Sequence, residues 1–218
     1  MLVACAGHDR LIEFDGEVHG NFEPSISRDG RSCASCHIDG RDDGLSWRTP
    51  FGNRQTPMLA GRLTTTAPYA WNGAHATLDD ALSSTLLRLG GLMGNKGLPG
   101  KDREALLAFV RQLPVPPQSR PEARELALGK SLFDDPKVGC ASCHGGPALT
   151  DQKAHDVGSG GSFDTPSLLG AVGTNPYFHD GRHATLRDAL VKTSGHMGAV
   201  AHLSEPELQA VLAYVESL

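Results

Sequence analysis

The chain has 218 residues, of which 39% are hydrophobic and only 6% aromatic, so packing two separate interiors would require help from a large buried cofactor. The net charge of -5 and the scattered Lys and Arg residues argue against nucleic-acid binding. The sequence contains no run of about 18 or more apolar residues, the length that a transmembrane helix needs.

Residues 1–20 form a lead-in to the first recognisable motif. Leu2-Val3-Ala4-Cys5 resembles the end of a bacterial lipoprotein signal, which would make Cys5 a lipid anchor and the chain's one membrane attachment. The basic region and apolar core of such a signal do not precede it. The alternative is an irregular or strand-like segment in which Cys5 is a buried thiol.

Helix signals follow one another along the rest of the chain. Helices are predicted to begin at Thr77 and Thr185, and to span residues 102–113, 121–133 and 205–218. Ser204 and Glu207 have the spacing of a capping box. The Gly-rich stretch 156–161 is expected to be a loop around a cofactor rather than a strand. We therefore predict an all-α protein with much irregular structure.

The second half of the chain repeats the first at a nearly constant offset. T-P-M-L-A-G…A-P-Y-A-W-N-G-A-H-A-T-L-D-D-A-L…L-M-G is matched by T-P-S-L-L-G…N-P-Y-F-H-D-G-R-H-A-T-L-R-D-A-L…H-M-G. The Pro-rich segment 114–121 lies between the copies and predicts a semi-rigid linker. Residues 21–113 and 122–218 are thus predicted to be two tandem copies of one cofactor-binding domain.

Each copy contains the pentapeptide C-A-S-C-H. In a C-x-x-C-H segment, the cysteine sulfurs bond to the vinyl groups of a haem and the histidine ligates its iron. One haem is assigned to Cys33, Cys36 and His37, and the other to Cys140, Cys143 and His144. A zinc site or a redox dithiol is disfavoured, because no second cysteine pair completes a metal cage. The sequence predicts two covalently bound haem c groups in cytochrome c-like domains.

The second axial ligand of each iron is less constrained by the sequence. Met93 and Met197 occupy matching places in L-M-G and H-M-G, although an isolated methionine is usually core filler. A thioether ligand raises the reduction potential of haem iron and suits electron transfer. Histidines are the rival ligands, and the candidates are His75, His155, His179, His183 and His196.

The segment from Gly129 to Gly198 resembles the bacterial di-haem cytochrome c peroxidase superfamily, which includes the methylamine dehydrogenase maturation enzyme. The resemblance rests on G-K-S-L-F-D-D-P-K-V-G-C-A-S-C-H-G-G-P-A-L-T, T-P-S-L, Y-F-H-D-G-R and H-M-G. It implies that Met197 ligates the electron-transfer haem of the C-terminal domain. It also implies that Trp71, in Y-A-W-N-G, lies between the haems and passes electrons, with an ordinary core aromatic as the alternative.

Several positions depart from that family. Leu92 and Ala81 stand where the peroxidases carry their catalytic Glu and Gln, so peroxide cleavage would lose its acid–base groups. Leu45 stands where the family has a switchable histidine ligand. The family also has calcium between its domains, and Gln55, in place of an Asn near Arg54, argues against calcium here.

These residues support two main functions. The first is single-electron transfer in the periplasm, with both haems His/Met ligated and with a small cytochrome c, a copper protein or a membrane electron-transfer complex as partner. The second is an enzyme that reduces hydrogen peroxide at the N-terminal haem. A protein-modifying oxidase is a third reading, although the maturation enzyme has a tyrosine where this chain has Met197. A periplasmic location follows from haem attachment, which takes place outside the cytoplasmic membrane.

Overall fold

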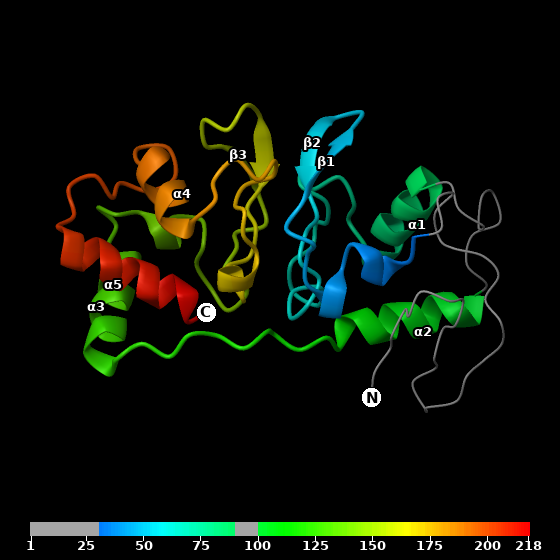
Figure 1. Cartoon of the computed structure of the whole chain (residues 1–218), viewed down its shortest axis with the longest axis horizontal. Helices are drawn as coiled ribbons and strands as arrows, with labels where there is room; N and C mark the ends of the chain where they lie inside the picture. Colours follow the sequence, from blue (N-terminus) through cyan, green and yellow to red (C-terminus); the bar gives the residue numbers. More distant parts are fainter. Residues whose placement is uncertain (1–30, 90–99) are drawn as a thin grey trace.

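The computed structural model describes residues 31–89 and 100–218, and its two halves lie side by side (Figure 1). An extended segment without helix or strand, residues 113–122, runs beneath both halves and joins them. Cys5, Leu92 and Met93 lie outside the described residues. Within the described part of the chain, every helix is too short or too polar to cross a membrane.

The prediction of an all-α protein is wrong. The described chain is 38% helical and also contains two small antiparallel sheets, so its fold is mixed α/β. The sheets are formed by β1 (Ser46–Thr49) with β2 (Gly52–Gln55), and by β3 (Ala154–Asp156) with β4 (Ser162–Asp164). Four short 3-10 helices are also present: η1 (Cys33–Ser35), η2 (Ile38–Gly40), η3 (Cys140–Ser142) and η4 (Ala171–Gly173).

Both hairpins form where a polar side chain closes a tight turn. The Thr49 hydroxyl donates to the carbonyl of Gly52 at 2.7 Å and fixes the β1–β2 turn. In the second hairpin, the N–H of Gly158 donates to the Asp156 carboxylate at 2.9 Å. The stretch predicted as a loop is therefore the end of β3 and the turn into β4. Strands this short carry too little alternation of apolar residues to be visible in the sequence.

The described helices are α1 (Leu78–Leu89), α2 (Gly100–Arg111), α3 (Ala123–Asp134), α4 (Leu186–Lys192) and α5 (Glu205–Glu216). The predicted starts at Thr77, Thr185 and Ser204 directly precede α1, α4 and α5, whereas α2 begins two residues before and α3 two residues after the predicted start. The hydroxyl of Thr185 accepts the N–H of Asp188 at 3.0 Å. The predicted capping box is confirmed, since the N–H of Ser204 donates to Glu207 at 2.8 Å.

Each half has its own small apolar core. In the first, Leu86 of α1 packs against Leu106 of α2. In the second, α3 and α5 pack closely at Gly129, where an added Cβ would lie 2.0 Å from the carbonyl oxygen of Ala210. Only glycine allows that approach. Because these cores are small, much of each half consists of loops that are available to surround a cofactor.

An ion pair joins the first turn of one helix to the last helix in each half, with opposite polarity. In the first half, Asp79 of α1 pairs with Arg103 of α2. In the second half, the position equivalent to Asp79 is Arg187 of α4, which pairs with Glu205 of α5 through two bonds of 2.7 Å. The two helices are thus joined by an ion pair in each half, with the acidic and basic residues exchanged.

Candidate haem sites and the contact between the halves

The two C-x-x-C-H segments have the same local structure. Each begins with a 3-10 turn, η1 or η3, that is closed when the histidine N–H donates to the first cysteine carbonyl. The distance is 2.8 Å from His37 to Cys33 and 3.0 Å from His144 to Cys140. All four cysteines are partly buried. Each turn therefore holds two thiols and an imidazole within one short segment, as covalent haem attachment requires.

Both histidine rings are held by backbone carbonyls. Nδ1 of His37 donates to the carbonyl of Arg41 at 3.2 Å, and Nδ1 of His144 donates to that of Leu149 at 3.3 Å. Burial lowers the pKa of both rings, and the hydrogen bonds only partly oppose it. A neutral ring tied at Nδ1 has Nε2 available for a metal. The donor set therefore fits haem iron.

The thiols lack the environment of a zinc or redox site. Burial raises the pKa of the Cys140 thiol to about 11. Burial and the nearby charge of Asp43 raise the pKa of Cys36 as well. Zinc-binding and redox-active cysteines are instead thiolates stabilised by positive surroundings. The surroundings of these two thiols thus differ from those of zinc-binding and redox-active cysteines.

Met197 lies beside the second haem motif, whereas its neighbour His196 does not. Met197 is partly buried and packs on the apolar cluster that also contacts Cys140. At Gly198, an added Cβ would lie 3.7 Å from the Cys140 sulfur and 3.0 Å from the carbonyl oxygen of Val138. The glycine of the M-G pair thus lets this segment approach the motif closely. His196 is exposed, and its ring lies against Gly158.

The remaining histidine candidates have different surroundings. His75 and His183 each form an isolated bridge, with Tyr69 and Tyr177 respectively. His183 is buried, and within the described part of the chain its Nδ1 has no hydrogen-bond partner. His179 is only 6% exposed and stacks on Phe163.

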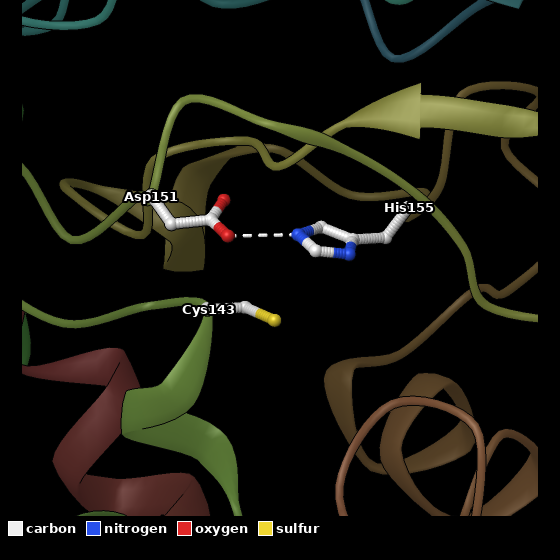
Figure 2. Close-up of side chains that lie close together, drawn as sticks. All are labelled: Cys143, Asp151 and His155. Atoms are coloured by element: carbon white, nitrogen blue, oxygen red, sulfur yellow. Dashed lines mark hydrogen bonds and ion pairs between the residues drawn. The ribbon is translucent and has the colours of Figure 1, made fainter.

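His155 lies beside the second haem motif, in a group with Cys143 and Asp151 (Figure 2). Its Nε2 lies 2.7 Å from the Asp151 carboxylate, and the ligand atoms of the three residues lie within 4.8 Å of one another. Because Cys143 belongs to the second C-x-x-C-H segment, this group borders that segment. The sequence analysis missed Asp151, which no motif identifies.

Trp71 lies where the two halves meet. Its indole N–H donates to the carbonyl of Gln55 at 2.8 Å, and its own carbonyl accepts the N–H of Asp164 at 2.9 Å. The ring makes an edge contact with His179, with a centroid distance of 6.4 Å. The side-chain amide of Gln55 crosses to the other half, where it donates to the carbonyl of Thr174 at 2.9 Å. Sequence reasoning did not identify Gln55 or Asp164 as partners of Trp71.

Two of the positions that depart from the peroxidase pattern, Leu45 and Ala81, lie within the described residues. Leu45 is 52% exposed, and its carbonyl accepts the N–H of Thr56. Ala81 lies in the first half of α1.

Comparisons with known proteins give a matching family and several similar proteins. Residues 123–217 match the family described as di-haem cytochrome c peroxidase. The chain is 26% identical to hydrazine synthase subunit gamma of Kuenenia stuttgartiensis, over 86% of this chain and 72% of that protein. It is 33% identical to the cytochrome c peroxidase Ccp of Escherichia coli, over 34% of this chain and 18% of that protein.

A solved structure shares the fold across both halves. The crystal structure of a MauG-like protein associated with microbial copper homeostasis superposes with a TM-score of 0.70 and 21% identity, covering 88% of this chain and 84% of that one. The family resemblance stated from the sequence is confirmed, and that family implies haem c as cofactor. Residues 123–217, which carry the second haem motif and Met197, are thus similar to the di-haem cytochrome c peroxidase family.

Proposed function

We propose that the protein is a di-haem cytochrome that transfers single electrons, with the C-terminal haem iron ligated by His144 and Met197. The observation that carries the proposal is the position of Met197, which packs on the same apolar cluster as Cys140. His37 and Met93 are proposed to ligate the N-terminal iron in the same way. A haem ligated on both faces has no open position for a substrate, so it exchanges electrons only.

The haem supplies a one-electron iron couple, and the chain sets its surroundings. The carbonyls of Arg41 and Leu149 fix the ring planes of the two histidines. The apolar cluster around Val138 and Val211 excludes water from the Met197 side. With a haem bound, both effects would keep His144 and Met197 in place as its ligands while it supplies one-electron chemistry.

Location and partners are part of the same proposal. Covalent attachment of haem c takes place outside the cytoplasmic membrane, which supports a periplasmic protein. A small cytochrome c, a copper protein or a membrane electron-transfer complex would then deliver or accept the electron. The relative in Kuenenia stuttgartiensis is a subunit by name, and this supports function in contact with other redox proteins.

Adjacent substitutions in the haem-loaded protein test the ligand assignment. Met197→Ala is expected to remove the charge-transfer band of a methionine-ligated ferric haem, to lower the potential of that haem and to produce a high-spin EPR signal. His196→Ala is the matched control and is expected to change none of these. If His196→Ala has the larger effect, or if the wild-type protein shows a five-coordinate C-terminal haem, the assignment fails.

The second candidate is peroxide reduction at the N-terminal haem, and the family match favours it. The relative from Escherichia coli is a cytochrome c peroxidase, although the match covers only 34% of this chain. Steady-state turnover with peroxide and a reduced cytochrome or copper donor tests it. Turnover no faster than that of free haem rejects this function, and sustained turnover replaces the first proposal.

A further inference from the structure

The structure adds ring contacts to the electron path that the sequence suggested between the two haem motifs. Trp71 and His179 occupy equivalent positions in Y-A-W-N-G and Y-F-H-D-G, and their rings meet at the contact between the halves. Edge contacts at this centroid distance are favourable for aromatic rings. His179 stacks in turn on Phe163, with a centroid distance of 3.6 Å and an interplanar angle of 16°.

The C-terminal side of this stack leads to the second haem motif. Phe163 of β4 is the cross-strand partner of His155 in β3, and directly paired side chains in a hairpin are neighbours. His155 belongs to the group that contains the sulfur of Cys143. The three rings of Trp71, His179 and Phe163 therefore end one side chain away from a haem attachment point.

The Trp71 end of this stack is connected to the first haem motif by a short stretch of backbone. The indole N–H of Trp71 bonds to the carbonyl of Gln55. Gln55 is followed by Thr56 and Pro57, and the backbone of Pro57 lies beside the ring of His37. Three consecutive residues thus separate the Trp71 contact from a proposed iron ligand.

We propose that His179, held between Trp71 and Phe163, is the C-terminal member of the electron relay between the two haems. One electron leaves a ferrous haem iron, which becomes ferric, and reduces the ferric iron of the other haem. No bond is made or broken, and no proton moves. This inference rests on the proposed electron-transfer function and adds a residue to it. Electronic coupling falls steeply across gaps between groups, so continuous ring contacts favour this route.

The surroundings of His179 support a neutral ring fixed in one orientation. Burial lowers the pKa of His179, and the cations of Arg54 and Arg182 act in the same direction against the opposing charge of Asp180. The guanidinium of Arg54 also lies over the far ring of the stack, Phe163, at 5.1 Å.

The test is the rate at which an electron, injected by pulse radiolysis into the fully oxidised haem-loaded protein, redistributes between the haems. His179→Leu is expected to slow redistribution by roughly tenfold, whereas His179→Phe keeps a ring in place and stays close to wild type. Phe163→Leu is expected to slow it as well. Phe51→Leu is the control, because Phe51 is 79% exposed at the turn of the first hairpin. Both reduction potentials are expected to stay unchanged in every variant.

The outcomes separate the relay from the proposed function. If the wild-type protein redistributes the electron and His179→Leu does so equally fast, the relay is wrong and the function stands. If His179→Phe is as slow as His179→Leu, the ring contact is not the route. If the wild-type protein shows no exchange between two haems, the proposed function itself fails.

Discussion

Trp71 and His179 are placed alike in the two copies, and each accepts, at its backbone carbonyl, an N–H from the opposite half. Gln55 donates to His179 at 2.7 Å, and Asp164 donates to Trp71 at 2.9 Å. Gln55 and Asp164 are themselves equivalent, since each stands two residues before the proline of a T-P pair. The contact is therefore reciprocal, as in an interface between two identical subunits related by a two-fold axis. The side chains at the two equivalent positions differ, because one half supplies Trp71 and the other supplies His179. The two sides of the contact are therefore chemically distinct.

Haem attachment can be tested by mass. The mature protein is expected to exceed its polypeptide mass by two haem groups, because each C-x-x-C-H segment forms two thioether bonds. Replacing Cys33 and Cys36 together by Ser, or Cys140 and Cys143 together, is expected to leave one haem. Cys5→Ser is the control and retains both. Intact-mass spectrometry of the denatured protein measures this, and a wild-type mass without haem would refute the cofactor assignment.

Because α3 packs closely on α5, one added methyl group at this contact is expected to have a large effect on the free energy of unfolding. In Gly129→Ala the new Cβ would overlap the carbonyl of Ala210, so the helices must separate at a cost of about 1–3 kcal/mol in the free energy of unfolding. Gly100→Ala is the matched control, because no atom of the described residues lies within 4 Å of its added Cβ. Urea unfolding of the haem-loaded proteins compares them. Equal midpoints for Gly129→Ala and wild type would contradict the close contact.

The surroundings of Asp164 predict that the free energy of unfolding depends on pH. Burial, with the repulsion of Asp151 added, raises the pKa of Asp164 to about 6, and its buried Oδ1 has no hydrogen-bond partner among the described residues. The folded state thus holds this proton more tightly than the unfolded state, in which the pKa is near 3.8. The free energy of unfolding is therefore expected to fall as pH rises from about 4 to about 6.

Asp164→Asn removes that titration. Above pH 6 the variant is expected to exceed wild type in the free energy of unfolding by on the order of 1–3 kcal/mol, and the difference should shrink toward pH 4. Glu104→Gln, an exposed position on α2, is the control and should leave the pH profile unchanged. The measurement is denaturant unfolding across this range. A constant difference between Asp164→Asn and wild type would show that the carboxyl does not titrate there.

The paired bonds of Arg187 with Glu205 predict a rescue experiment. Arg187→Glu places two carboxylates together and is expected to lower the melting temperature modestly, because both side chains are largely exposed. Adding Glu205→Arg restores an ion pair of reversed polarity, as Asp79 and Arg103 form it in the other half. Thermal unfolding of the single and double variants measures the recovery. A double variant no more stable than Arg187→Glu would show that the pair contributes nothing.

Local features of the sequence predicted much of this structure, and features that depend on distant contacts did not. The caps at Thr185 and Ser204 and the two C-x-x-C-H turns need only neighbouring residues, so their patterns are visible in the sequence. The hairpins were missed because Ser46–Thr49 and Ser162–Asp164 have no regular alternation of apolar residues. The partners of Trp71 were missed because backbone N–H and carbonyl groups leave no signature in a sequence.

The exchanged charges of the two inter-helix ion pairs bear on how the chain assembles. Two copies of one sequence could also fold with their last helices exchanged, so that α1 packs against α5 and α4 packs against α2. Such a crossed arrangement would bring Asp79 toward Glu205 and Arg187 toward Arg103, and like charges repel. The correct arrangement brings opposite charges together in both places. The charges at these four positions therefore favour packing of α2 and α5 within their own halves. Two identical copies would carry the same charges at both places and could not favour one arrangement over the other.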